Sequence, residues 1–582
     1  MNRFIKVTAT AFCLLYGLLP SQAQDRAVLY EADFSSLPAA KLKLTKDWSA
    51  QDGLRLKSKD WWWETATLDV GAQDYQLDAV VDICSNGQGQ GNGAGVIFRR
   101  KAGGSAVFYI SQSLGGYLAQ GELLGGKKAG NRDSVYALSK DKEVGLRHLR
   151  AVIKGKVANF YVDGQLACIL NLTDYPEGEV GLYGHYQVVF KSFSVRALLP
   201  DAKVVASRPL RELLPNQKIY PAQQSWTSAV AKAGAALDQA IAEGTEGVPG
   251  EERMPAYTYR CVTDMKSGVR PFYAYPAFHH ALFIKGLIDY SRFTKDPKYL
   301  KEATRLGEWN IHHSTPENFK LPNLPYSTTY NGKMGGNVDG DTVMLDKAGA
   351  MGLAYLALWD LEKRDLFKTG AVKIAETLLS LQLSDGRWQN RVEPATGKVV
   401  QDYTSSQAFN IELMDRLYVI TGEKRYAESS RRALRWLLDN PVKTYRWTGY
   451  YEDVNPNVES IGNWDAIETA RYLVRHRKDD PTYLKLATDI FEWVATSFAV
   501  EQDGKWPLVC EQTICMPVMS CHTFHFAQLC IELNGATGEK YYRDASMSAA
   551  NAAFDLSRSA EGWYSLMLSP IYLGIDVEQQ LK

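Results

Sequence analysis

The first third of the chain alternates apolar and polar positions with a period of two. Residues 75–79 show this alternation clearly, which is typical of a strand with one buried face. Residues 94–99 are apolar in both phases, so they predict a strand covered on both sides. Residues 157–170 form two strand-like runs around Asp163-Gly164, a pair that favours a two-residue hairpin turn. Many short strands of this kind predict a two-layer β-sandwich.

Later in the chain, apolar residues recur with the spacing of amphipathic helices. The predicted helices span residues 225–243, 276–293, 297–313, 344–362, 366–383, 405–420, 424–439, 462–477, 481–498, 519–535, 539–557 and 565–578. Tight turns alternate with connections of about 20–30 residues, a length that is usually functional in compact domains. The pattern therefore predicts six helical hairpins.

Tryptophans mark a repeat within this helical region. Trp388, Trp447, Trp506 and Trp563 follow one another at intervals of 59, 59 and 57 residues. A fixed period of this size indicates stacked copies of one supersecondary unit. We expect the tryptophans to pack between hairpins, because large aromatic side chains dominate core contacts.

The long connections are expected to lie at one end of the helical domain. Each one leaves the second helix of a hairpin and enters the first helix of the next, so all of them meet at the same rim. This rim is the predicted functional face.

Length and charge limit the possible classes of protein. A chain of 582 residues is too long for one core, so at least two domains are expected. We assign residues 24–198 to the sandwich, 199–222 to a proline-punctuated linker and 223–582 to the helical domain. Basic and acidic residues balance at 66 each, which argues against recruitment by nucleic acid.

The amino-terminal segment has the features of an export signal. Arg3 and Lys6 precede an apolar stretch, and Ser21-Gln22-Ala23 is a small-x-small cleavage site, so residues 1–23 are predicted to be a signal peptide. The longest later apolar run, residues 348–359, is shorter than the roughly 20 residues needed to span a bilayer. We therefore expect a periplasmic or secreted protein without a membrane span.

Two resemblances to known families refine the predicted fold. Residues 93–99, 157–164, 178–182 and 188–193 resemble the concanavalin-like sandwich of laminin-G modules and of the 3-keto-disaccharide hydrolase-like family. Residues 225–582 resemble the six-hairpin (α/α)6 toroid of many glycoside hydrolases and some polysaccharide lyases. The resemblance implies a multidomain fold, with an all-β sandwich followed by an all-α (α/α)6 toroid, and an oligosaccharide or polysaccharide substrate.

Asp339 and Asp341 precede a strongly apolar helix at the predicted rim. A carboxyl group that must hold a proton near neutral pH needs burial or a second carboxylate beside it, and these two residues satisfy the second condition. Asp341-Thr342-Val343-Met344 resembles the Asp-x-x-Met segment of unsaturated glucuronyl hydrolases, although Leu345 replaces the Asn or Gly that follows in that family. The resemblance implies that Asp341 is the general acid/base and that the substrate carries uronic acid. Alternatively, either aspartate is an N-cap.

Glu459 and Glu511 are the candidates for a second catalytic carboxylate. The remaining candidates are polar or aromatic residues suited to sugar hydroxyls and ring faces, and we predict substrate contacts at Tyr273, His279, Tyr403, Gln407, Asp453, Asn463, Trp464 and His522. They cluster before or at the starts of predicted inner helices.

Three thiols lie close to His522 and His525. Cys510, Cys515 and Cys521 invite a metal interpretation, but an exported protein also permits a disulfide between the first two, or buried thiols. We predict no metal and no cofactor.

Three functions fit these residues. The preferred one is an exported glycoside hydrolase that uses two carboxylates on a uronate-containing glycan. A polysaccharide lyase would instead use a Tyr or His base, with Arg260 or Arg270 neutralising the uronate. A non-catalytic glycan-binding protein is the third alternative.

Overall fold

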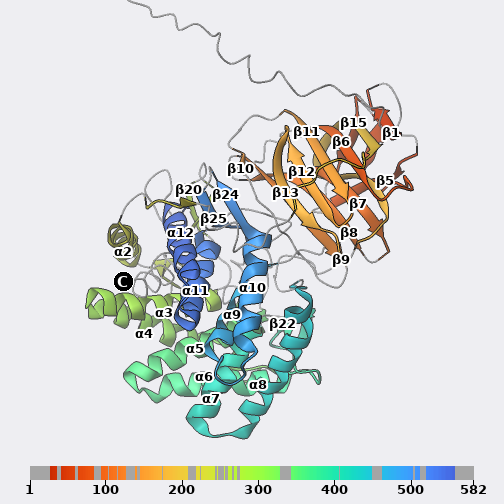
Figure 1. Cartoon of the computed structure of the whole chain (residues 1–582). Helices are drawn as coiled ribbons and strands as arrows, with labels where there is room; N and C mark the ends of the chain where they lie inside the picture. Colours follow the sequence, from red (N-terminus) through yellow and green to blue (C-terminus); the bar gives the residue numbers. More distant parts are fainter. Residues whose placement is uncertain are drawn as a thin grey trace, which may run out of the picture.

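A sandwich of strands and a helical domain lie side by side in the computed structural model (Figure 1). The structure describes residues 27–35, 41–50, 52–58, 63–83, 93–102, 104–113, 116–125, 138–139, 145–173, 175–206, 218–222, 225–242, 245–246, 254–255, 260–264, 268–271, 276–327, 342–404, 407–447, 462–502, 505–511 and 520–556. Within these ranges, no helix is both long and apolar enough to cross a bilayer.

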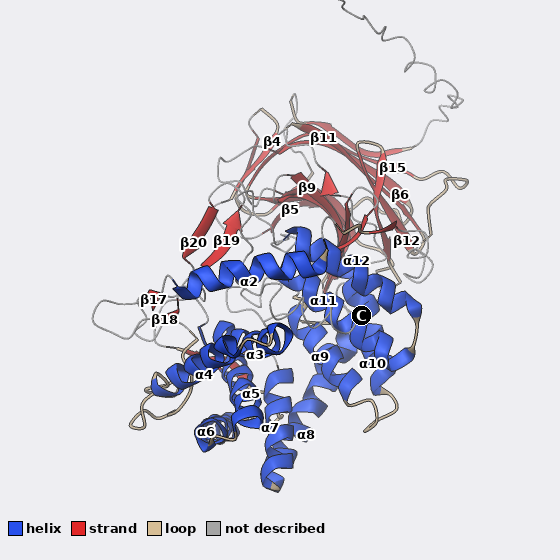
Figure 2. Ribbon diagram, turned by 90° about the vertical axis from the view of Figure 1, so that its left-hand side faces the viewer, coloured by secondary structure: helices blue, strands red, loops and turns tan. Residues whose placement is uncertain are grey.

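Two antiparallel sheets form the sandwich. Its strands are β1 (Val28–Asp33), β2 (Lys43–Leu44), β3 (Trp48–Ala50), β4 (Leu54–Lys57), β5 (Trp63–Leu68), β6 (Tyr75–Ile83), β7 (Gly93–Lys101), β8 (Gly104–Ser113), β9 (Gly116–Gly125), β10 (Leu138–Ser139), β11 (Leu146–Lys154), β12 (Val157–Val162), β13 (Gln165–Asn171), β14 (Glu179–His185) and β15 (Gln187–Ala197). One sheet has the order β13-β12-β11-β6-β15-β4-β3, with β1 paired to β15, and the other has the order β10-β9-β8-β7-β14-β5-β2. We call them the outer and inner sheets, because the first arches over the second on the side away from the helices (Figure 2).

The predicted strand signals are confirmed. In β6, Leu77, Ala79 and Val81 are buried in the core, while the alternate side chains point to the other face. Most of β7 is buried in both phases. Asp163 and Gly164 both have positive φ, at 49° and 82°, the backbone that a type I′ turn between β12 and β13 requires.

Eleven of the twelve predicted helices fall within the described residues, and each is present to within three residues at either end. They are α2 (Trp226–Ala242), α3 (Pro276–Thr294), α4 (Pro297–His312), α5 (Leu345–Glu362), α6 (Asp365–Leu381), α7 (Ala408–Thr421), α8 (Lys424–Leu437), α9 (Trp464–Arg475), α10 (Tyr483–Phe498), α11 (Ser520–Thr537) and α12 (Lys540–Leu556). The predicted helix at residues 565–578 lies outside the described part of the chain.

Tight turns form five described hairpins, from α3/α4 to α11/α12. Asp296 caps α4 by accepting a hydrogen bond from the amide of Lys298 at 2.9 Å, and Pro297 occupies the first turn. Gly422 ends α7 with a φ of 74°, a conformation that favours glycine. These two residues explain why Asp-Pro recurs at residues 480–481 and Gly-Glu-Lys at residues 538–540, in the tight turns within other hairpins.

The first helices of the hairpins form an inner layer. Successive contacts run from α3 to α5, α7, α9 and α11. Helix α2 connects the two ends of the outer layer: Asp238 accepts a hydrogen bond from Tyr299 of α4 at 2.8 Å, and Trp226 donates to Asn551 of α12. The described helices therefore follow the arrangement of a toroid.

The repeated tryptophans that are described pack as expected. Trp388 and Trp447 are completely buried, and Trp388 Nε1 donates to the carbonyl of Leu378 in α6 at 2.8 Å. The side chain of Trp506 and all of Trp563 lie outside the described residues.

The last residues of the predicted linker pair with a strand of the helical domain. Lys218–Ile219 forms β16, which pairs in parallel with β25 (Lys505–Val509), and β25 pairs with β24 (Ala499–Gln502). The amide of Tyr220 donates to Ser548 of α12 at 2.7 Å. Backbone pairing therefore attaches this end of the linker to the helical domain.

Candidate active site

The first turns of the five inner helices converge on one buried cluster. Phe278 of α3 lies 5.8 Å from Trp464 of α9 and 6.1 Å from Phe409 of α7, measured between ring centroids. Trp464 in turn lies 5.3 Å from His522 of α11. Lys347 of α5 places its Nζ 4.3 Å from the centre of the Phe278 ring. Residues near the starts of all five helices thus meet at the same end of the inner layer.

Small residues allow the inner helices to approach closely. A Cβ built on Gly349 of α5 would lie 2.0 Å from Oδ1 of Asn410 in α7, and one on Gly352 would lie 2.7 Å from Leu413. Any larger side chain at these positions would separate α5 from α7. The glycines therefore set the spacing of the helix starts that build the cluster.

Asn463 connects α9 to α11 and to the end of β25. It is the N-cap residue of α9, but its side chain makes no capping hydrogen bond. Instead, Asn463 Nδ2 donates to the carbonyl of Cys510, and Asn463 Oδ1 lies 2.6 Å from His522 Nδ1. This orientation of the amide requires His522 to donate from Nδ1, which leaves the lone pair on Nε2.

His522 is neutral over the physiological range. Burial, aided by the neighbouring His525, lowers the pKa of His522 to about 3. A neutral imidazole in a fixed tautomer can accept a proton or a hydrogen bond from a hydroxyl group. This chemistry fits the predicted role of His522 as a substrate contact.

Glu511 follows the Cys510 carbonyl that Asn463 holds. It is half-buried, and its negative charge is close enough to Cys521 to help burial raise the pKa of that thiol well above its usual range. Glu511 therefore lies beside the start of α11. Among the predicted catalytic carboxylates, it is the one whose position the structure describes.

Glu468 is a buried carboxylate on α9, one turn after Trp464. Burial opposes its ionisation, but the charge of Arg471 and the hydrogen bond from His525 outweigh that effect and hold the pKa of Glu468 below its ordinary value. Glu468 Oε1 lies 2.7 Å from His525 Nε2 and 3.3 Å from Arg471 Nη1. Arg471 also reaches Glu532 of α11 at 2.8 Å. This network joins α9 to α11 beneath Trp464.

Asp346 is the corresponding buried acid at the start of α5. Its Oδ2 lies 2.9 Å from Lys347 Nζ, so the two charges compensate one another within the cluster. The approach to α5 is fixed by β21 (Val343–Met344), which pairs with β22 (Gln389–Glu393), and by Thr342, whose hydroxyl accepts from Arg391 Nη1 at 2.8 Å. The chain that carries Asp341 is thus anchored at its carboxyl end.

The N-cap alternative for the two aspartates of this approach is wrong. The N-cap of α5 is Met344, which makes no side-chain capping bond, because β21 continues up to the helix. Asp339 and Asp341 both lie outside the described residues.

Several other predicted site residues also lie outside the description. They are Tyr273, Asp453, Glu459 and the side chain of Tyr403. The structure therefore brings together Asn463, Trp464, His522 and Glu511 from the predicted set and also describes His279 and Gln407.

His279 and Gln407 are described but take other positions. His279 is buried on α3 beside Phe278, with ring centroids 6.2 Å apart. Gln407 is buried before α7, and its Oε1 accepts from the backbone amide of Trp388 at 3.3 Å. Gln407 thus supports the hairpin packing around Trp388.

Sequence reasoning missed five members of the cluster, namely Phe278, Asp346, Lys347, Glu468 and His525. Their signal was available, since each stands within the first two turns of an inner helix. The charged residues among them are not recognisable from sequence alone, because the sequence does not show that a neighbouring helix supplies their partners.

Cys521 and Cys530 are buried thiols. Burial raises the pKa of Cys530 as it does that of Cys521, so both thiols stay protonated. Among the described residues, no three His, Cys, Asp or Glu side chains are grouped as for a metal ion. Cys515 lies outside the description, so the proposed disulfide stays a prediction.

Comparisons with known proteins give distant similarities. No family model matches the chain. Over 164 residues it is 20% identical to mannosyl-oligosaccharide 1,2-alpha-mannosidase mans-2 of Caenorhabditis elegans, and the match covers 28% of each protein. The chain thus spans 28% of the length of the curated relative it matches.

Among solved structures, a family 76 glycoside hydrolase from a bovine Bacteroides thetaiotaomicron strain aligns with 93% of this chain and 98% of its own, at 10% identity and a TM-score of 0.43. A D-mannose isomerase aligns with 62% of this chain and 99% of its own, at 12% identity and a TM-score of 0.44.

Proposed function

We propose that the protein is an exported glycoside hydrolase whose helical domain cleaves a glycan at the end where the inner helices begin. The observation that carries this proposal is the linked set of Trp464, Asn463, His522 and Glu511. It offers an aromatic face, a positioned imidazole and a carboxylate, which are the groups that sugar binding and acid/base hydrolysis need. The limited similarity to a mannosidase supports the same class of reaction.

Glu511 is one catalytic carboxylate in this proposal. Asp341, or its neighbour Asp339, is the second, on the connection that enters α5. Thr342 and the Lys347–Phe278 contact bring the start of α5 to the same cluster. Asn463 positions His522, and His522 binds a substrate hydroxyl through Nε2. Glu459 is the alternative second carboxylate, from the connection that enters α9.

A neutral, mannose-containing glycan is the substrate that we favour. The two described cations of the cluster, Lys347 and Arg471, are each paired with a carboxylate. Their charges are therefore neutralised, and they would bind the carboxylate of a uronate only weakly. The mannosidase similarity points the same way. A uronate substrate, suggested by the Asp341 resemblance, would depend on Arg260 or Arg270, whose side chains lie outside the description.

The test is a screen of the purified protein against mannans, mannose oligosaccharides and uronate glycans. Hydrolysis yields reducing sugars that chromatography separates, whereas β-elimination also yields an unsaturated uronate that absorbs ultraviolet light. Release of mannose or manno-oligosaccharides without ultraviolet absorbance is the expected result. Absorbing products would replace hydrolysis by the lyase mechanism, and binding without any product would favour a glycan-binding protein.

The Asp341→Asn variant tests the second carboxylate. We expect a loss of turnover of roughly 100-fold or more, the usual contribution of general acid–base catalysis. Wild-type activity of this variant on every cleaved glycan would transfer the role to Asp339 or Glu459. Export is tested separately, by sequencing the amino terminus of the mature protein, which we expect to begin after Ala23.

A further inference from the structure

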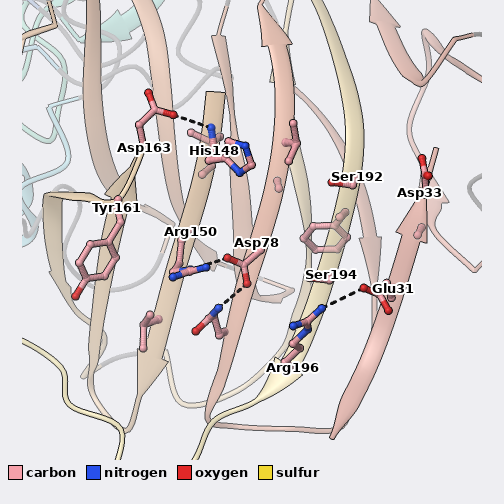
Figure 3. Close-up of a pocket in the computed structure, with 18 residues that line it drawn as sticks. Glu31, Asp33, Asp78, His148, Arg150, Tyr161, Asp163, Ser192, Ser194 and Arg196 are labelled. Carbon is pink, nitrogen blue, oxygen red and sulfur yellow. Dashed lines mark hydrogen bonds and ion pairs between the residues drawn. The ribbon is translucent and has the colours of Figure 1, made fainter. Parts of the chain in front are cut away.

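The outer sheet of the sandwich carries a groove on the face that points away from the helical domain. Side chains from five neighbouring strands, β12, β11, β6, β15 and β1, line it (Figure 3), and its volume is about 880 Å³. Ligand sites of proteins have volumes of about 300–1,000 Å³. The groove is therefore large enough for a short oligosaccharide.

Ion pairs organise the polar side chains of the groove. Asp78 accepts from Arg150 Nε at 2.6 Å and from Gln76 Nε2 at 2.5 Å. Arg196 Nη2 donates to Glu31 at 3.1 Å. Figure 3 shows these pairs side by side across the sheet. Exposed ion pairs add at most about 1 kcal/mol each to stability, so folding alone gives little reason to collect them on one face.

The charges favour a neutral ligand over an anionic one. The described lining residues include four carboxylates, from Glu31, Asp33, Asp78 and Asp163, and two guanidinium groups, from Arg150 and Arg196. Arg147 also pairs with Asp163 at 3.3 Å, so four carboxylates stand against three guanidinium groups, and a uronate or sulfated sugar meets no net positive charge there. Hydroxyl groups, in contrast, can donate to the carboxylates and accept from the arginines.

The groove also offers apolar surface beside these polar groups. Val80 and Val152 flank the Asp78–Arg150 pair, Val80 opposite His148 and the buried Val152 opposite Gln76, and the half-buried ring of Tyr161 stands on β12. Sugar rings present C–H groups next to their hydroxyls, and such a ligand matches a surface of alternating apolar and polar side chains.

We propose that this groove is a second, non-catalytic binding site for a neutral oligosaccharide. It would hold a glycan chain on the sandwich while the helical domain cleaves it. Binding there does not depend on hydrolysis, although the choice of mannan as first probe rests on the proposed function. Because the site lies outside the helical domain, its loss leaves cleavage of a small soluble substrate unchanged.

The test compares full-length wild type with the double variant Asp78→Asn/Arg150→Gln, which removes both charges, keeps the size of the first side chain and shortens the second. The matched control is Lys101→Gln/Glu177→Gln, an exposed ion pair on the inner sheet. Affinity electrophoresis through gels that contain mannan, a neutral glucan or polygalacturonate measures binding, and turnover of a short soluble glycoside is measured in parallel.

We expect wild type and the control variant to be retarded by a neutral glycan and not by polygalacturonate. The groove variant should bind the same glycan at least tenfold more weakly, with unchanged turnover of the short substrate. Equal retardation of groove variant and wild type, retardation by polygalacturonate alone, or no retardation by either neutral glycan would overturn the proposal. If wild type cleaves no glycan, and only the groove variant loses retardation, the hydrolase assignment is wrong but the groove is still a glycan-binding site.

Discussion

His522 and Asn463 join the starts of two inner helices across 59 residues of sequence, with Nδ1 of the imidazole 2.6 Å from Oδ1 of the amide. That separation equals the interval between successive repeated tryptophans. Glu468 and His525 make the second link between the same helices, at a separation of 57 residues. Equivalent positions of consecutive repeats are thus neighbours in space, which is why a local sequence motif does not reveal the cluster.

Replacing Asn463 with alanine should destabilise the protein. The change leaves His522 Nδ1 and the Cys510 carbonyl without their buried partner, and each unsatisfied group costs about 1–3 kcal/mol. Urea denaturation should therefore show a loss of about 2–6 kcal/mol. Asn440→Ala is the control, because that amide is exposed and bonds only a local carbonyl. Equal stability of the two variants would contradict the linking role of Asn463.

The stability of the helical domain should decrease as the pH falls below about 6.5. Burial lowers the pKa of His280 to about 3, so between pH 6.5 and pH 3 the unfolded chain binds a proton that the folded protein rejects. His280→Gln removes that difference. Its stability should change less steeply with pH than that of wild type, by about 1.4 kcal/mol per pH unit.

Denaturation at a series of pH values measures this slope. A slope in His280→Gln that equals the wild-type slope would show that His280 does not carry the effect. The variant keeps a side chain able to bond Asn310, whose amide lies 2.7 Å from His280 Nδ1.

Trp388→Ala should cost about 3–5 kcal/mol, because it empties a completely buried site between hairpins. Trp388→Phe keeps most of the apolar volume and loses the hydrogen bond to Leu378, so a smaller loss, of about 1–3 kcal/mol, is expected. Thermal unfolding followed by calorimetry ranks the two variants. Equal losses of stability in the two variants would contradict the prediction that Trp388 stabilises the protein through its packing volume.

The repeat and the helix periodicity predicted most of the helical domain. Eleven helices are present within three residues of their predicted ends, because apolar spacing and Asp-Pro or Gly turns act locally. The sandwich followed from period two and from Asp163-Gly164. Neither signal depends on distant contacts, so the sequence alone was sufficient to predict the helices and the sandwich.

The site was less predictable for a physical reason. Asn463 and Asp346 have the residue types of N-caps, and in the structure Asn463 bonds a neighbouring helix while Met344 precedes α5 as its N-cap. Which partner a polar side chain takes is decided by helix packing, and that packing depends on residues such as Gly349. The aspartates before α5 remain candidates from sequence alone.

The most direct test of the proposed hydrolase is the turnover of manno-oligosaccharides by Glu511→Gln. The control is Glu428→Gln, an exposed glutamate on the outer helix α8, and thermal unfolding confirms that both variants fold. We predict that kcat falls by roughly 100-fold or more in Glu511→Gln and stays at the wild-type value in Glu428→Gln. Unchanged kcat in the folded Glu511→Gln protein, or no cleavage of any glycan by wild type, would contradict the account.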